Sequence, residues 1–128
     1  SWYWPAKDAF GTWQFPLAEI AIVGTAKKTL SMDYNFYVQQ SRGLRDAANK
    51  ELYKKQMIDS YMKYFNDNYF GRRAPIHIGH HFSRWNDGAY WEAMQVFAEN
   101  VCGQPEVKCV TYADYANWLD SLNQETLN

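Results

Sequence analysis

Three histidines, His77, His80 and His81, lie close together between positions 77 and 81, and the 128-residue chain contains no others. An imidazole held by a carboxylate can donate or accept a proton near neutral pH, because the carboxylate fixes which ring nitrogen carries the proton. Asp33 is the candidate carboxylate. The pattern favours general acid–base chemistry. Two simpler interpretations stay open: one buried histidine among surface ones, and Asp33 as a turn residue bonded to nearby backbone N–H groups.

The same residues do not make a complete metal site. His80 and His81 are adjacent, so on an extended segment their side chains point to opposite faces, and His77 faces away from His80. A catalytic zinc needs three protein ligands in a suitable arrangement. Asp33 could join one histidine, but no third ligand is evident in the sequence. We therefore expect no complete metal site within this chain.

Nucleophilic catalysis has no support in the sequence. The chain lacks a Gly-x-Ser-x-Gly elbow and a phosphate-binding glycine loop, and neither Cys102 nor Cys109 has an evident base beside it. Six residues separate these cysteines, a spacing unlike the C-x-x-C of metal sites. They form either a local disulfide, if the chain is exported, or two buried free thiols.

The first half of the chain must position Asp33. Positions 13–22 read as an extended segment that Pro16 interrupts, because proline removes a hydrogen-bond donor from the ladder. A short strand is expected at 29–33, and polar, irregular sequence follows at 39–48. Asp33 would then stand at the end of a strand.

The second half must position the histidines. The best helix spans 49–69, with an apolar stripe at four-residue intervals, and positions 75–81 alternate as a strand does. A second helix is expected at 89–101, a short strand at 107–110 and a last helix to about residue 122. The stripe of the helix at 49–69 comprises Tyr53, Met57, Tyr61 and Phe65. Thr111 is expected to cap the last helix. That helix would bury Tyr115, Trp118, Leu119 and Leu122.

This order of elements predicts an α/β fold in which helical crossovers join parallel strands. In such folds the chemistry gathers at the C-terminal ends of the strands, where Asp33, His80 and His81 are expected. No internal repeat or linker divides the sequence, so residues 1–128 are interpreted as one domain or a large piece of one.

Composition narrows the class of partner. The net charge is −1 and the pI about 6.3, so no basic surface points to nucleic acid, and no apolar run is long enough to cross a membrane. Aromatic residues make up 18% of the chain. They indicate either a core rich in large rings or a surface on which sugars stack.

The histidine segment resembles a known motif. The run from Pro75 to Asn86, with its continuations at 88–91 and 105–112, is similar to the late histidine motif of polysaccharide deacetylases, carbohydrate esterase family 4. In that family an apolar-x-apolar-x-His strand supplies the catalytic histidine, and Ile76, Ile78 and His80 match its phase.

Two earlier stretches also resemble that family. Leu30 to Tyr37 resembles the preceding motif, in which an Asp near an aromatic residue supports the histidine. Asp33 is the only carboxylate there, whereas the family often has two, with Trp where Tyr37 stands. Trp13 to Leu17 is similar to the aromatic-x-apolar-Pro strand that often comes before it. The resemblance spans about residues 13 to 122.

The departures from the family concern the metal. Its metal ligands come from an early Asp-Asp motif and a helix-borne His-x-x-x-His motif. No Asp-Asp pair occurs in this sequence, and the one pair of histidines with the second spacing, His77 and His81, lies in the expected strand rather than on a helix. The resemblance therefore implies that residues 1–128 are a single partial domain, the C-terminal part of a distorted (β/α) barrel. The partner of this chain would be the missing N-terminal half of the domain or a separate chain. A divalent metal, with zinc as the leading candidate, would be bound by residues outside this chain.

The implied function is metal-dependent hydrolysis of N- or O-acetyl groups on a polysaccharide. His80 would act as the general acid, oriented by Asp33, with His81 as the second candidate for that role. The carbohydrate would lie against Tyr37, Trp85, Tyr90 and Trp91, although Tyr90 and Trp91 are equally expected to pack within a helix. The alternative is a non-catalytic carbohydrate-binding or structural module derived from the same fold.

The resemblance also bears on location and behaviour. Its members are commonly extracytoplasmic, which implies a periplasmic or secreted protein and favours the disulfide between Cys102 and Cys109. Part of a barrel leaves strand edges unpaired, so the isolated chain is expected to be inactive and to aggregate or to associate with its missing half.

Overall fold

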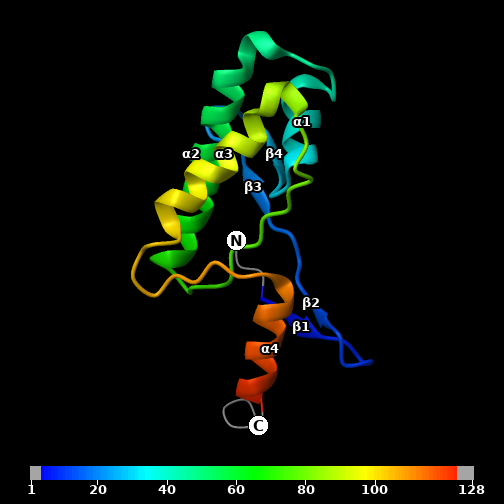
Figure 1. Cartoon of the computed structure of the whole chain (residues 1–128), viewed down its shortest axis with the longest axis vertical. Coiled ribbons are helices and arrows are strands. Elements are labelled where there is room, and N and C mark those ends of the chain that lie inside the picture. The colour runs from blue at the N-terminus through cyan, green and yellow to red at the C-terminus, as the bar shows by residue number, and fades with distance from the viewer. Residues whose placement is uncertain (1–3, 124–128) are drawn as a thin grey trace. The chain divides into compact units, whose positions relative to one another are not determined.

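The computed structural model describes residues 4–123, and the chain divides into two compact units, Ser1–Phe97 and Ala98–Asn128. Its class is mixed α/β, about 50% helical, with two small antiparallel sheets (Figure 1). No closed barrel forms among the described residues. None of the helices in the described part is long and apolar enough to span a bilayer.

Two short hairpins begin the first unit. Strands β1 (Ala6–Lys7) and β2 (Trp13–Gln14) pair antiparallel, and so do β3 (Glu19–Ala21) and β4 (Lys28–Leu30). Hairpin partners need only a local turn, whereas parallel partners need a long crossover. The prediction of parallel strands joined by helical crossovers is therefore wrong for these two sheets.

One parallel contact does join distant parts of the chain. Met32 forms an isolated parallel bridge with Gly79, and the Gly79 N–H donates to the Ser31 carbonyl at 2.9 Å. The Asp33 N–H donates back to the Gly79 carbonyl at 3.1 Å. The predicted strand at 75–81 is thus an extended segment with a single bridge, and this bridge brings Asp33 beside the histidines.

Helix α1 (Asp33–Ser41) occupies sequence that was expected to be the end of a strand followed by irregular chain. Asp33 favours a helix start because its carboxylate accepts the Tyr34 N–H at 2.7 Å and suits the positive end of the helix dipole. The helix ends at Arg42, in the left-handed conformation, whose N–H donates to Val38 O at 2.9 Å. Asp33 therefore lies at the first turn of a helix.

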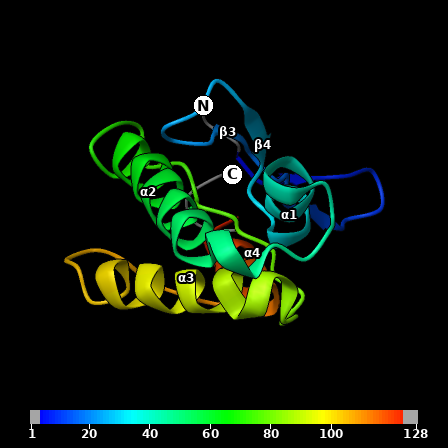
Figure 2. The same ribbon diagram turned by 90° about the horizontal axis from the view of Figure 1, so that it is seen from above.

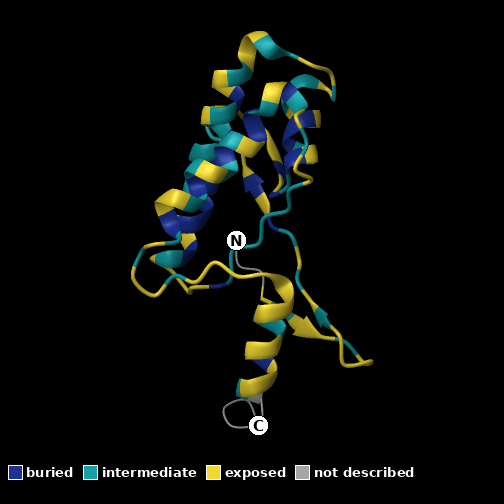
Figure 3. Ribbon diagram, viewed as in Figure 1, coloured by how far each residue is buried: buried dark blue, intermediate teal, exposed yellow. Residues whose placement is uncertain are grey.

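Helix α2 (Lys50–Tyr69), preceded by the short helix η1 (Ala47–Asn49), confirms the strongest helix prediction. The predicted stripe is buried, while Figure 3 shows that other parts of the helix are exposed; the members of the stripe are Tyr53, Met57, Tyr61 and Phe65. Helix α3 (Trp85–Val101) lies beside α2 in Figures 1 and 2, and Phe97 meets Tyr61 and Phe65 edge to face. Rings from two helices thus form much of the core of the first unit.

The beginning of α3 is unusual. Asn86, Asp87 and Gly88 all have positive φ, 49°, 57° and 82°, so right-handed helix starts only at Ala89, where the sequence predicts it. Three consecutive left-handed residues are rare, and two of these carry side chains. The backbone must therefore be held in this shape by its surroundings.

The second unit contains the end of α3 and helix α4 (Tyr112–Asn123). Cys102 and Cys109 form a disulfide, which confirms that expectation. Thr111 caps α4 as predicted, since its hydroxyl accepts the Asp114 N–H at 3.3 Å. No strand forms at 107–110. Leu119 is buried, Tyr115 and Leu122 are half-buried, and Trp118 is exposed, contrary to the prediction for that residue.

Candidate functional site

Asp33 is a buried carboxylate with well-placed donors. Its side chain is only 2% exposed, and it accepts the backbone N–H of Tyr34 at 2.7 Å and that of His81 at 2.8 Å. A buried charge is tolerated when it is hydrogen-bonded and paired. The first turn of α1 and the bridge to Gly79 together fix where this carboxylate points.

His81 is the imidazole that Asp33 holds most directly. His81 Nδ1 lies 2.6 Å from Asp33 Oδ1, while the His81 side chain is 53% exposed. An ionised carboxylate only accepts, so Nδ1 carries a proton and donates it. Nε2 is then the nitrogen that can exchange a proton, and no residue of the described chain bonds it. Asp33 and His81 thus form an oriented acid–base pair.

His80 occupies the opposite environment. Its side chain is 3% exposed, its Nε2 lies 2.9 Å from the Tyr61 hydroxyl, and its Nδ1 lies 4.0 Å from Asp33 Oδ2. Burial lowers the pKa of His80 to about 4, so the ring is neutral at pH 7. Burial also raises the pKa of Tyr61 well above its usual value, so the phenol keeps its proton. His80 is therefore a neutral ring behind the Asp33 carboxylate.

An aromatic cluster lies beside the Asp33–His81 pair. The Trp85 ring stacks on Tyr37 at 5.2 Å and 9°, meets Tyr34 edge to face at 5.4 Å, and lies 5.5 Å from the His81 ring. Trp85 is half-buried and Tyr34 is exposed. The structure thus brings together two of the predicted carbohydrate-contacting residues, Tyr37 and Trp85, next to His81.

The other two predicted contact residues lie elsewhere. Tyr90 is 1% exposed, and its hydroxyl donates to Gln40 at 2.8 Å and accepts from Asn86 at 3.1 Å. It therefore packs in the core, as the helix-packing interpretation expects. Trp91 is 38% exposed and meets Phe82 edge to face at 5.3 Å, as part of a second aromatic pair.

Asn86 holds the left-handed turn that carries Trp85. Its buried amide donates to Ser41 Oγ at 3.0 Å and accepts the Asp46 N–H at 2.8 Å, in addition to its bond with Tyr90. Next to it, Asp87 takes two bonds from Arg45 at 2.9 and 3.0 Å. Sequence reasoning missed this network. The only available signal was an Asn-Asp-Gly run, which favours left-handed backbone.

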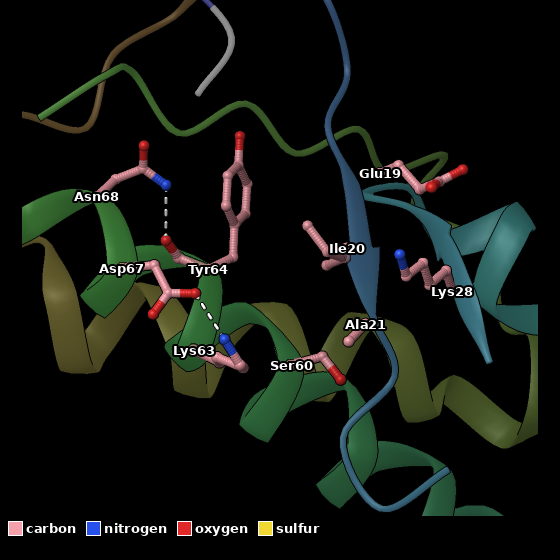
Figure 4. A pocket seen from close by; sticks show the side chains of 9 residues that line it. All are labelled: Glu19, Ile20, Ala21, Lys28, Ser60, Lys63, Tyr64, Asp67 and Asn68. Atoms are coloured by element: carbon pink, nitrogen blue, oxygen red, sulfur yellow. Dashed lines mark hydrogen bonds and ion pairs between the residues drawn. The ribbon is translucent and has the colours of Figure 1, made fainter. Parts of the chain in front are cut away.

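A separate hollow of about 300 Å³ lies between β3, β4 and α2 (Figure 4). On its α2 side, Lys63 and Asp67 pair at 2.7 Å, and the Asn68 amide donates to Tyr64 O at 2.9 Å. The Asn68 carbonyl oxygen is buried without a partner among the described residues, but in Figure 4 it points away from Ile20 and Ala21. No histidine or cysteine lines this hollow, so it adds nothing to the acid–base chemistry.

The donor atoms of residues 4–123 do not fit a metal centre. In that part of the chain no group of three or more His, Cys, Asp or Glu side chains is arranged so that it could hold a metal ion. Asp33 is already committed to His81 and to two backbone donors. These residues therefore do not supply the three ligands that a catalytic zinc site needs.

Comparisons with protein-family models, with curated proteins and with solved structures found no match for this chain.

Proposed function

We propose that this chain supplies the general acid of a carbohydrate deacetylase, and that Asp33 and His81 are the acid–base pair. The observation that carries the proposal is the 2.6 Å contact between His81 Nδ1 and a buried carboxylate, with the other half of the imidazole exposed. Neutral, buried His80 is less suited to exchange protons with a substrate. The resemblance to polysaccharide deacetylases supplies the reaction.

The reaction needs an acid at one step. Water adds to the acetyl carbonyl, the C–N or C–O bond breaks, and acetate leaves together with a free amine or hydroxyl. The departing nitrogen or oxygen must gain a proton, which the protonated His81 delivers from Nε2. Asp33 stabilises the positive imidazolium and holds its orientation through Nδ1. The Trp85 ring lies 5.5 Å from the His81 ring, and sugars stack on rings of this kind.

The water-activating divalent metal of this reaction, zinc first, belongs to residues outside the described chain, because the donor set here does not fit it. In this proposal the chain is the C-terminal part of a larger distorted barrel, completed by an N-terminal half or a partner chain. The parallel bridge between Met32 and Gly79 is the described pairing that agrees with such a barrel.

An extracytoplasmic location belongs to the same proposal. The disulfide between Cys102 and Cys109 supports it, because such bonds persist mainly in oxidising compartments.

The test is acetate release from an acetylated oligosaccharide by the protein that joins this chain to its metal-binding half. His81→Ala should lower turnover by about a hundredfold or more, since a general acid contributes roughly 10² to 10⁴. His77→Ala is the matched control, because His77 bonds the Pro16 carbonyl away from Asp33, and it should keep normal turnover. Full activity in His81→Ala with metal content unchanged would overturn the assignment.

A non-catalytic carbohydrate-binding module is the second candidate. The exposed rings of Tyr34 and Trp91 favour it, because sugars stack on such rings without any chemistry. Binding of the oligosaccharide with no acetate release in the completed protein would favour this candidate over the first.

A further inference from the structure

Tyr61 is a buried tyrosine that lies behind the acid–base pair. It belongs to the apolar stripe of α2, its side chain is fully buried, and it packs edge to face against Phe36 at 5.6 Å and Phe97 at 5.4 Å. Its ring also meets the His80 ring at 5.8 Å, and its hydroxyl oxygen lies 2.9 Å from His80 Nε2. Packing thus fixes the ring, and the one polar atom of this side chain contacts a histidine next to Asp33.

The direction of this hydrogen bond follows from the donors and acceptors present. Burial raises the pKa of Tyr61 well above its usual value, so the phenol keeps its proton. Among the described residues, His80 Nε2 is the hydroxyl's only hydrogen-bond partner. If Nε2 carried a proton, the Tyr61 proton would be buried without an acceptor, which costs free energy. The hydroxyl therefore donates and Nε2 accepts.

The proton of the neutral His80 ring must then lie on Nδ1. Burial lowers the pKa of His80 to about 4, so the ring carries one proton at pH 7. Nδ1 lies 4.0 Å from Asp33 Oδ2, which is too long for a hydrogen bond but close enough for an N–H dipole to act on a buried carboxylate. The other tautomer would leave a lone pair near the same negative oxygen. Hydrogen bonding and electrostatics therefore favour the same tautomer.

Asp33 contacts the two imidazoles in different ways. Oδ1 accepts the His81 Nδ1–H at 2.6 Å, whereas Oδ2 accepts the His81 backbone N–H at 2.8 Å and lies on the His80 side. Asp33 and His81 are the charged or titrating groups that act on His80, Tyr61 is neutral, and the Trp85 ring beside His81 carries no charge. The positive end of the His80 N–H therefore offsets part of the charge of the carboxylate and weakens its hold on His81.

We propose that Tyr61 and His80 are positioning residues: Tyr61 holds His80 as the neutral Nδ1–H tautomer, and this N–H sets how strongly Asp33 binds His81. Neither residue is placed to touch a substrate, because Tyr61 is fully buried and the His80 side chain is 3% exposed. With Nε2 occupied by the hydroxyl, His80 has no free nitrogen for a second proton, so it does not compete with His81 for Asp33. The link to turnover rests on the proposed function, whereas the tautomer does not.

The first test observes the His80 tautomer by NMR. The sample is the protein that joins this chain to its metal-binding half, labelled with a nitrogen isotope in its histidine rings, at pH 7. His80 should show a proton on Nδ1 and a hydrogen-bonded Nε2 without one. Loss of these signals in His80→Asn identifies them. A proton on Nε2 in the unsubstituted protein overturns the proposal.

The second test separates the N–H group of His80 from its bulk. His80→Leu fills the space without an N–H, whereas His80→Asn keeps one, because the amide nitrogen can take the place of Nδ1. In His80→Leu the bond between Asp33 and His81 should strengthen, so the His81 Nδ1 proton resonance should move downfield. The basic limb of the pH–turnover profile should rise by roughly half a pH unit, because protonated His81 is held more firmly. His80→Asn should restore both values.

Tyr61→Phe tests the tyrosine, and Tyr53→Phe is its matched control. Tyr61→Phe removes the donor to Nε2, so part of the His80 population should carry its proton on Nε2, and the His81 resonance should shift in the same direction as in His80→Leu. Tyr53 lies on the same buried stripe of α2, but its hydroxyl bonds Asp46. Its removal should leave both signals unchanged. Parental signals in Tyr61→Phe overturn the role of Tyr61, and equal shifts in His80→Leu and His80→Asn overturn the role of the N–H.

The positioning role and the proposed function fail separately, because the NMR measurements need no substrate. Normal turnover in His81→Ala would remove the acid–base assignment and leave the tautomer of His80 standing. Turnover lost in His81→Ala, together with a His80 proton on Nε2, would remove the positioning role alone.

Discussion

Asp33 and His81 are 48 positions apart in the chain, yet His81 Nδ1 lies 2.6 Å from Asp33 Oδ1 and the His81 N–H lies 2.8 Å from Oδ2. One carboxylate thus holds both the backbone and the side chain of the same residue. A pair fixed at two points has little freedom to rotate, so the exposed face of the imidazole keeps one direction. General acid catalysis depends on such orientation.

Replacing Asp33 should affect both stability and catalysis. Asp33→Asn keeps the size of the side chain but turns an NH₂ group toward a donor, so at least one of three hydrogen bonds is lost inside the protein. We expect unfolding free energy to fall by about 2–3 kcal/mol in urea titration. Turnover of the completed enzyme should also fall, but no further than in His81→Ala, because Asp33 acts on the reaction through His81. Asp59→Asn, at a surface pair with Lys55, is the control and should change little.

His80 should make the fold sensitive to mild acid. Its folded pKa is about 4, below the unfolded value of about 6.5, so the unfolded chain binds more protons between these two pH values. The contribution of His80 to the free energy of unfolding is therefore fully present above about pH 6.5 and is lost as pH falls toward 4. The total loss is on the order of 3 kcal/mol. Urea titrations at pH 7, 5.5 and 4.5 measure this loss.

His80→Gln removes the titrating group, so its stability should depend less on pH over the same window. Identical pH profiles for the parent and His80→Gln would contradict a buried, neutral His80.

Asn86 should contribute strongly to stability, although it is not part of the acid–base pair. Asn86→Ala removes three hydrogen bonds and places a residue with a poorer left-handed preference at φ 49°. We expect a loss of about 2–4 kcal/mol in thermal or urea unfolding. In Asn86→Gly the same hydrogen bonds are lost, but glycine adopts the left-handed backbone easily. The difference in unfolding free energy between the two variants therefore measures the cost of the backbone conformation. Near-parental stability in Asn86→Ala would mean that the turn is not held by this amide.

The disulfide should stabilise the second unit. The loop that Cys102 and Cys109 close is short, for which chain-entropy estimates give on the order of 2 kcal/mol. The double variant Cys102→Ser, Cys109→Ser should therefore lose helical signal from the second unit at lower urea. Reduction of the parent by dithiothreitol should reproduce the effect, whereas reduction of the double variant should have none.

The sequence predicted local features better than distant contacts. The stripe of α2, the Thr111 cap and the start of right-handed α3 each depend on residues within a few positions of one another. Helix α1 was missed because Asp33, which starts it, was interpreted as the end of a strand. The antiparallel hairpins were missed because the sequence of an extended segment does not determine which other segment it pairs with.

The candidate site was predicted in its members but not in their arrangement. Alternation placed His80 in phase with Ile76 and Ile78, and the same phase that matches the resemblance also predicts burial. Which of two adjacent histidines reaches Asp33 depends on a contact 48 positions away, and no local pattern encodes it. Asn86 was missed because its role depends on left-handed backbone that only the folded chain displays.

The bridge between Met32 and Gly79 is a single rung, and the two residues after Gly79 are both histidines. A slip of this rung by one residue would turn His80 outward and His81 inward, because successive side chains of an extended segment face opposite ways. If Ile78 replaced Gly79 in the rung, His80 would take the place that His81 now has beside Asp33. The second histidine therefore keeps an imidazole next to this carboxylate after a slip in that direction.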